Sequence, residues 1–218
     1  MGIGPDPTPR IDSPPLILAS GSPQRRAILA GLGVSFTVCP SGAAEIESGD
    51  PRKVALENAL RKARAAREAR AAELPAGTVL AEAVLGVDTL VTLDGVIYGK
   101  PADEAEARAT LRALCGSTHE VISGLALLLP GGVERTGLES TRVSFHELSE
   151  EELEAVLAHG EWRDRSGGYA IQGASGRVLA REVEGDWENV VGLPVAALRA
   201  LYPELFGAGA EDSAREIG

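Results

Sequence analysis

The sequence predicts an α/β fold with a mixed central sheet and flanking helices, on three observations. Segments typical of strands alternate with segments typical of helices along the 218 residues. The apolar share of 44% is that of an ordinary globular protein, and the length is sufficient to bury a sizeable core. We expect one domain over residues 15–206, preceded by a disordered, proline-rich leader (1–14) and followed by a flexible tail (207–218).

Net charge and apolar patterning exclude several classes of protein. The net charge of −11 argues against a protein that tracks a nucleic-acid polymer, because neutralising phosphates needs surplus Lys and Arg. It does not exclude a small anionic substrate, since a pocket can be locally basic. No apolar run approaches the roughly 18 residues that span a bilayer, and the N-terminal stretch lacks a signal-peptide pattern. We therefore expect a cytoplasmic protein with no membrane partner.

The first elements form a strand, a turn of small residues and a helix. An apolar run over 15–19 predicts a buried strand, and Ser22 with Pro23 predicts the N-cap and first turn of a helix that stops at Gly33. This arrangement directs backbone N–H groups and a helix N-terminus at one place, a plausible anion cradle.

A second strand is predicted over 34–38, followed by a polar loop with Glu45 and then a long helix. Asp50-Pro51 begins this alanine-rich helix, which runs to about Ala72 and carries seven Lys or Arg between Arg52 and Arg70. A solvated face is the default for such a series, with one or two cations free to point inward.

The remaining chain continues the alternation of strands and helices. The strongest strand is 84–93, and Asp94-Gly95 is typical of a hairpin turn that leads into 96–98. Further along we predict helices at 102–114, at 149–160 behind a capping box and at 194–201, strands at 121–129 and 142–145, and a strand-like pair after Gly168.

Asp88 is the main candidate for chemistry, because it lies within an apolar strand that predicts burial on both faces. An unpaired buried carboxylate costs several kcal/mol, roughly, so it needs a cation, hydrogen-bond donors or a proton. One interpretation is structural, a salt bridge to an arginine or a bond with Thr89. The other, which we favour, is a metal ligand or general base at a strand end, where open α/β sheets bind ligands.

Other polar residues are weaker candidates. Lys100 lies between Gly and Pro and suits a phosphate as a point charge, although a lysine in this setting is more often a surface turn residue. Arg25 and Arg26 oppose the dipole of the first helix, so a bound phosphate or Glu45 would compensate them. Gln172 could bind a base edge or stabilise a turn. Together these residues indicate a divalent-metal phosphate site.

Six motifs in series resemble the Maf family of nucleoside triphosphate pyrophosphatases, over about Leu16 to Leu205. These motifs are Leu18–Arg26, Gly86–Val91, Gly99–Pro101, Thr118–Val121, Tyr169–Gly173 and Asn189–Pro194. The resemblance implies two lobes around a deep cleft, as in the related inosine-triphosphate pyrophosphatases, and usually a homodimer. It implies hydrolysis of a nucleoside triphosphate between its α and β phosphates.

The resemblance also implies roles for individual residues. Asp88 matches the family's general base, and Glu45 falls where the family places an acidic ligand for a divalent cation, Mg²⁺ or Mn²⁺, with Asp88 as the second ligand. Four residues match the phosphate side of the site: Ser20, Arg25, Lys62 and Lys100. Cations and a divalent metal neutralise a polyphosphate, while a carboxylate orients the attacking water.

Base preference depends on three positions. Thr89 and Gln172 are similar to the branch that prefers dTTP and UTP, whereas Gln24 departs from it, since that branch usually carries Arg there. Two alternatives stay open: a 7-methyl-GTP-type pyrophosphatase, and a non-enzymatic regulator of septum formation, the process from which the family takes its name.

Overall fold

The computed structural model describes residues 15–207, so the predicted leader (1–14) and all of the predicted tail after Gly207 lie outside the described residues. Its seven strands form a single sheet in the order β2-β1-β3-β5-β6-β7, with β4 paired to β3. The strands are β1 Leu16–Leu18, β2 Phe36–Val38, β3 Ala83–Leu93, β4 Val96–Tyr98, β5 Thr118–Leu128, β6 Glu134–Phe145 and β7 Ala180–Glu184. Because β1 is parallel to β2 and β3 while the other pairs are antiparallel, the sheet is mixed, as predicted.

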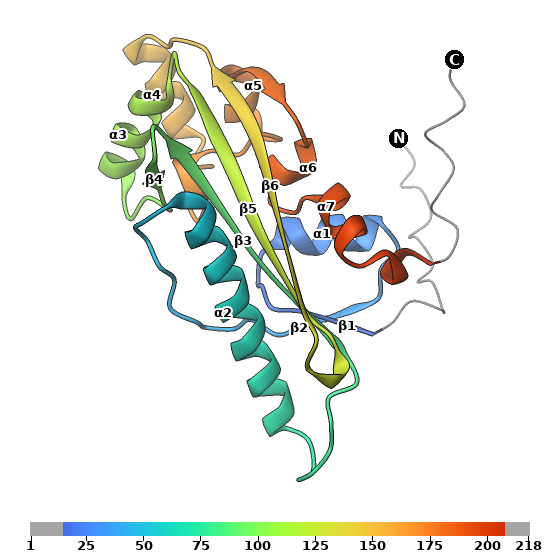
Figure 1. The fold of residues 1–218 in the computed structure, drawn as a ribbon. Helices are drawn as coiled ribbons and strands as arrows, with labels where there is room; N and C mark the ends of the chain where they lie inside the picture. The colour runs from blue at the N-terminus through green and yellow to red at the C-terminus, as the bar shows by residue number, and fades with distance from the viewer. Residues whose placement is uncertain (1–14, 208–218) are drawn as a thin grey trace, which may run out of the picture.

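Seven α-helices surround this sheet (Figure 1). They are α1 Pro23–Gly31, α2 Pro51–Ala72, α3 Glu104–Leu114, α4 Glu150–Ala158, α5 Ala174–Leu179, α6 Trp187–Val191 and α7 Val195–Leu201. Short 3-10 turns lie at Pro130–Gly132, Ser166–Gly168 and Pro203–Phe206. No helix within residues 15–207 has the length and apolarity to cross a membrane, and Cys39 and Cys115 are both free thiols.

The core is divided between the two ends of the long strands. At one end Leu85 of β3 packs with Leu29 of α1 and Leu198 of α7. At the other end Leu111 of α3 and Val156 of α4 pack with the far halves of the same strands. One face of β3 and β5 supports both lobes, and α2 runs along the opposite face of the two strands, where Ala59 and Ala63 pack with Val84 (Figure 1).

Several local predictions are confirmed at the level of single hydrogen bonds. Ser22 caps α1 and Asp50 caps α2 through bonds to the third backbone N–H beyond each, with Pro at the first helical position. Ser149 and Glu152 form both bonds of a capping box. Asp94 and Gly95 both have positive φ, 52° and 80°, as a two-residue hairpin between twisted strands requires.

Two predictions of strands were wrong. β6 begins at Glu134 rather than at residue 142, because its first half pairs with β5 although its side chains are polar and partly exposed. The segment after Gly168 is not a pair of strands: a turn leads into helix α5, and only β7 follows as a strand. A short apolar run bounded by glycines does not by itself distinguish a buried strand from a buried helix.

Two glycines bring α2 into direct contact with the sheet. A Cβ at Gly86 of β3 would lie 2.1 Å from the Ala59 carbonyl oxygen, and a Cβ at Gly124 of β5 would lie 2.3 Å from that of Ala55. Gly124 pairs in register with Asp88, so the close approach occurs beside this carboxylate. The side chains of α2 that face the sheet therefore reach Asp88 directly.

Candidate active site

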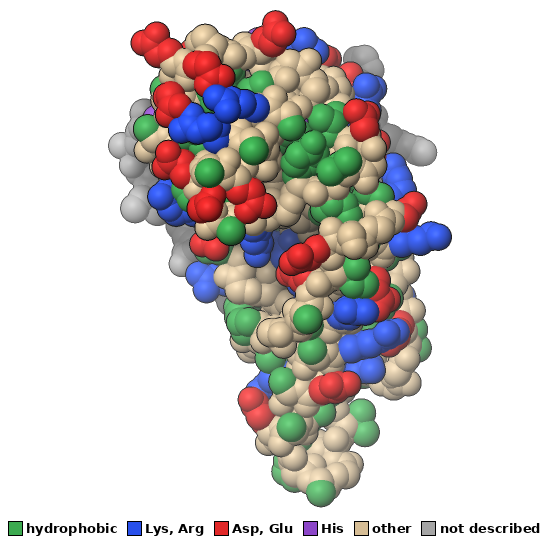
Figure 2. Space-filling view, turned by 90° about the vertical axis from the view of Figure 1, so that its left-hand side faces the viewer, with side chains coloured by type: hydrophobic (Ala, Val, Ile, Leu, Met, Phe, Trp, Pro, Cys, Tyr) green, Lys and Arg blue, Asp and Glu red, His purple; other side chains and the backbone are tan. Residues whose placement is uncertain are grey.

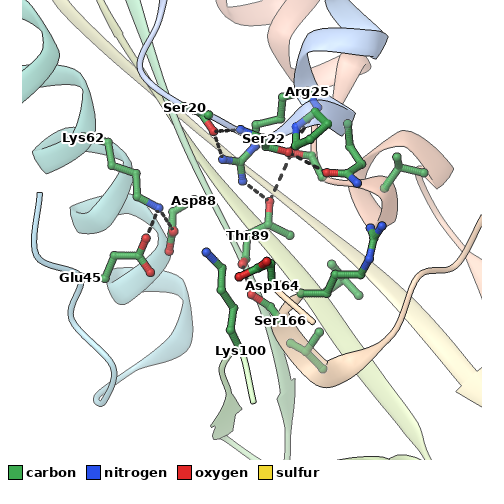
Figure 3. A pocket seen from close by; sticks show the side chains of 18 of the residues that line it. Ser20, Ser22, Arg25, Glu45, Lys62, Asp88, Thr89, Lys100, Asp164 and Ser166 are labelled. Carbon is green, nitrogen blue, oxygen red and sulfur yellow. Dashed lines mark hydrogen bonds and ion pairs between the residues drawn. The ribbon is translucent and has the colours of Figure 1, made fainter. Parts of the chain in front are cut away.

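A cleft of about 670 Å³ lies between the two lobes, a volume typical of small-molecule sites. All nine residues predicted from the sequence line it: Ser20, Gln24, Arg25, Glu45, Lys62, Asp88, Thr89, Lys100 and Gln172. They come from the loop before α1 and its first turn, the loop after β2, helix α2, the middle of β3 and two later turns. The fold thus brings together residues that are far apart in the sequence (Figure 3).

Asp88 is 5% exposed and has a partner on each carboxylate oxygen. Asn58 donates from Nδ2 to Oδ2 at 3.1 Å, and Lys62 donates from Nζ to Oδ1 at 2.5 Å. The cation that offsets its burial is therefore a lysine on α2, not the arginine or Thr89 of the structural interpretation. A carboxylate accepts at about four lone-pair positions, so two donors leave capacity for a water molecule.

Lys62 lies between two carboxylates. Its Nζ is 2.7 Å from Oε1 of Glu45 as well as 2.5 Å from Asp88, and its side chain is only 13% exposed (Figure 3). Burial raises the pKa of Glu45, but the hydrogen bond and charge of Lys62, with the charges of Lys100 and Arg25, hold it below its usual value overall. Glu45 therefore stays ionised, as a metal ligand must.

Asn58 is a site residue that the sequence reasoning missed. It is 2% exposed, and besides Asp88 it binds the backbone of Ile46 twice: Oδ1 accepts from N at 2.8 Å and Nδ2 donates to O at 3.0 Å. It thereby attaches the loop of Glu45 to helix α2. One sequence feature could have identified Asn58: it lies four residues before Lys62 and therefore on the same face of the helix.

Arg25 connects the first turn of α1 to β3. Its guanidinium donates to the Gly192 carbonyl at 2.9 Å, to Ser20 Oγ at 2.9 Å and to Thr89 Oγ1 at 3.1 Å, all of them neutral oxygens. Burial lowers its pKa, an effect that the charges of Asp88 and Glu45 oppose. Arg25 thus remains a fixed cation whose charge has no direct carboxylate contact.

Lys100 and Gln172 line the cleft at positions exposed to solvent. The Lys100 side chain extends toward the space beside Asp88 and Thr89 (Figure 3), and among residues 15–207 it has no salt bridge of its own. A flexible, unpaired ammonium at the mouth of a cleft is suited to an anion that arrives from solution.

The loop that leads into the second 3-10 turn, Ser166–Gly168, contributes residues that the sequence reasoning did not select. Arg163, Asp164, Arg165 and Ser166 all line the cleft. With them, the lining includes five cationic and three carboxylate side chains, although the whole chain carries a net charge of −11. Elsewhere, on the face that Figure 2 shows, acidic and basic side chains are interspersed. The excess of positive charge in the cleft favours an anionic ligand.

The cleft offers two carboxylates as ligands for a divalent metal. Glu45 and Asp88 lie close enough to share one ammonium group, and no cluster of three or more His, Cys, Asp or Glu occurs in the described part of the chain. Two carboxylates fit Mg²⁺ or Mn²⁺ if substrate phosphates and water complete the coordination, as is usual for Mg²⁺. They do not form a site enclosed by protein ligands alone.

The sequence profile described as "Maf-like protein" matches residues 15–205. The chain belongs to this Maf family. It is 45% identical over 202 residues to a dTTP/UTP pyrophosphatase of Deinococcus radiodurans, covering 92% of this chain and 96% of that protein. It is 42% identical to a dTTP/UTP pyrophosphatase of Pyrococcus furiosus, covering 85% and 93%, respectively.

Two solved structures show a more distant similarity. The Ham1 protein of Staphylococcus aureus covers 61% of this chain and 72% of its own, with 15% identity and a TM-score of 0.42. A nucleoside-triphosphatase, dITP/XTP pyrophosphatase, of Mycobacterium abscessus covers 67% and 94%, with 21% identity and a TM-score of 0.39.

Proposed function

We propose that this chain is a nucleoside triphosphate pyrophosphatase that cleaves the α–β phosphoanhydride of dTTP or UTP, or of related modified nucleotides, and so cleans the nucleotide pool. The observation that carries the proposal is the buried carboxylate of Asp88 in a cleft with an excess of cations. A base beside fixed positive charges suits attack of water on a phosphate. The named activity of the relatives supports the same reaction.

In this mechanism Asp88 accepts a proton from the attacking water. The water oxygen bonds to the α-phosphorus, the bond from that phosphorus to the bridging oxygen breaks, and pyrophosphate leaves with the bonding electron pair. Asn58 and Lys62 hold Asp88 in place through its two oxygens. Arg25 and Lys100 provide positive charge for the phosphates, and Ser20 fixes the Arg25 guanidinium.

A divalent cation would be held by Glu45 and Asp88, and when bound it would neutralise phosphate charge and lower the pKa of coordinated water. Lys62 already contacts both carboxylates, so it would turn toward the phosphates when the metal binds. The metal requirement is part of our proposal.

The pyrimidine preference is supported by the relatives' printed activity and by two positions in the cleft. Thr89 and Gln172 both line it, with Thr89 held by Arg25 and by Ser123 Oγ at 2.8 Å. A homodimer and a cytoplasmic location stay predictions, as does the lack of nucleic-acid polymer or membrane partners. Sedimentation of the purified chain would test the dimer.

The reaction is tested with purified protein, Mg²⁺ or Mn²⁺, and a panel of canonical and modified triphosphates that includes 7-methyl-GTP. We expect equal amounts of monophosphate and pyrophosphate, with dTTP and UTP among the best substrates. Release of single phosphate would place the cut at the wrong bond. No turnover of any triphosphate would favour the non-enzymatic regulator instead, and 7-methyl-GTP as the preferred substrate would favour the other branch.

Asp88→Asn tests the base directly. We expect kcat to fall by about 10²–10⁴, the usual contribution of general-base catalysis, since the amide cannot take the proton. The matched control is Asp94→Asn, the same change in the exposed hairpin turn that follows the same strand. Thermal melts of both variants check the fold. A wild-type rate for Asp88→Asn would make this residue structural only.

A further inference from the structure

The loop at residues 163–168 is fixed to the elements that carry the proposed chemistry. Ser166 Oγ donates to the Thr89 carbonyl at 2.9 Å, and Gly167 N–H donates to the Gly99 carbonyl at 3.0 Å. A Cβ on Gly167, whose φ is +72°, would lie 2.7 Å from Cγ2 of Val91, so only glycine fits this contact. The loop therefore keeps one position relative to Asp88 and Lys100.

Within this loop the side chain of Arg165 is held from the opposite side of the cleft. Gln24, in the first turn of α1, donates from its amide nitrogen to Ser22 Oγ at 3.0 Å. Its amide oxygen accepts from Nη1 and Nη2 of Arg165, both at 3.1 Å. In this orientation the amide nitrogen has an acceptor, Ser22 Oγ, and the amide oxygen has donors in the Arg165 guanidinium. Arg165 is thus positioned by a neutral group that leaves its charge intact.

No carboxylate in residues 15–207 forms a salt bridge with Arg165, which is half-buried in the lining of the cleft. Other arginines have such partners: Arg64, Arg108 and Arg112 each pair with a glutamate outside the cleft. Arg163, two residues earlier, stacks its guanidinium 4.2 Å from the centre of the Trp162 ring. A partly desolvated guanidinium without a counter-ion needs an anion to offset its charge.

We propose that Arg165 binds the polyphosphate of the substrate, and that Gln24 is the positioning residue that aims it. This inference rests on the proposed function and adds a phosphate contact from the loop at residues 163–168. The sequence places Gln24 among the positions that determine base preference. In our proposal Gln24 instead affects substrate binding indirectly, by positioning Arg165.

Inorganic pyrophosphate is the direct probe, because it carries phosphate charge and no base. Its Kd is measured by calorimetry in the presence of Mg²⁺ for the wild type, Arg165→Gln and a control, Arg26→Gln. Arg26 is an exposed residue of α1 outside the cleft, so the control removes the same charge. We expect binding to weaken about 10- to 100-fold in Arg165→Gln, as for a lost charged hydrogen bond, and to stay unchanged in the control.

Steady-state kinetics then separates phosphate from base contacts. We expect Arg165→Gln to raise KM for UTP, dTTP and CTP by the same factor, with kcat changed less than about threefold. Arg165→Lys, which keeps the charge, should recover part of the affinity. Wild-type pyrophosphate binding in Arg165→Gln, or a changed ranking of the bases, would overturn the proposal. A wild-type enzyme without any turnover would instead refute the proposed function.

Gln24 is tested by a double-mutant cycle. Gln24→Leu releases Arg165, so we expect it to weaken pyrophosphate binding in the wild-type background and to have no further effect in Arg165→Gln. Equal effects in both backgrounds would mean that Gln24 contacts the ligand itself, which contradicts its positioning role.

Discussion

At the scale of single residues, the two carboxylates proposed to hold a metal already have a cationic partner before substrate arrives. The single ammonium of Lys62 contacts both Glu45 and Asp88, and Asn58 also donates to Asp88 from α2. Removing one partner of such a buried group leaves an uncompensated charge, which costs more than the pair contributes. The sequence identified Asp88 from its apolar strand and Lys62 from a family resemblance, but their contact required the structure.

Lys62→Met tests whether this lysine competes with a divalent cation. Without the ammonium, Glu45 and Asp88 repel each other, so we expect Mn²⁺ to bind the free protein about tenfold more tightly or better. The measurement is the electron paramagnetic resonance signal of free Mn²⁺ in a titration. Lys53→Met, an exposed position of the same helix, controls for net charge. Weaker or unchanged Mn²⁺ binding would contradict a shared place for the lysine and the metal.

At the scale of elements, helix α2 positions the site because it contacts the sheet without intervening side chains. Its basic outer face is solvated, as expected, and makes exposed salt bridges to strands and within the helix, including Arg52 with Glu120 and Arg61 with Glu57. Only Lys62 turns inward to Asp88. The charge pattern alone could not show which lysine or arginine points inward, because this depends on how α2 packs against β3 and β5.

Gly124→Ala tests the close contact. The added methyl would overlap the Ala55 carbonyl, so we expect the free energy of unfolding to fall by at least about 1–3 kcal/mol and turnover to fall with it, since α2 must shift away from Asp88. Urea denaturation measures the first effect. Gly137→Ala on β6 is the matched control, because its Cβ would meet only side chains, the nearest at 3.6 Å. Equal stability of the two variants would show that the helix can adapt.

At the scale of the whole molecule, the two lobes and the cleft were expected, and all nine predicted site residues line one cavity. Helix ends and the hairpin were also predictable, because they depend on neighbouring residues such as Ser22 with Pro23 or Asp94 with Gly95. The first half of β6 and the nature of α5 were not, because both depend on distant partners. Arg165 was missed for the same reason: Gln24 holds it across the cleft.

The stability of the molecule should depend on pH through His119. Burial lowers its pKa from 6.5 to about 4, and Nε2 bonds Tyr169 OH at 3.0 Å in the core of one lobe. The unfolded chain binds a proton below pH 6.5 that the folded chain does not bind until about pH 4. We therefore expect stability to be full above 6.5 and to decrease by about 3 kcal/mol, in order of magnitude, between 6.5 and 4. Urea midpoints across this range measure it. His119→Gln should flatten the slope, and an unchanged slope would place the pH dependence elsewhere.

Because Lys62 places a positive charge beside Glu45 and Asp88, we expect the chain to fold without a bound metal. Many proteins with metal sites fold only when the metal binds, because its charge offsets that of the ligands. Here the Lys62 side chain provides a positive charge beside the two carboxylates. If a divalent cation is required for activity, as we propose, we expect the protein to fold in a metal-poor environment and to gain activity when the metal binds. A chelator should abolish turnover while moving the melting temperature by no more than about 2 °C. A large loss of thermal stability on chelation would show that the metal is structural as well.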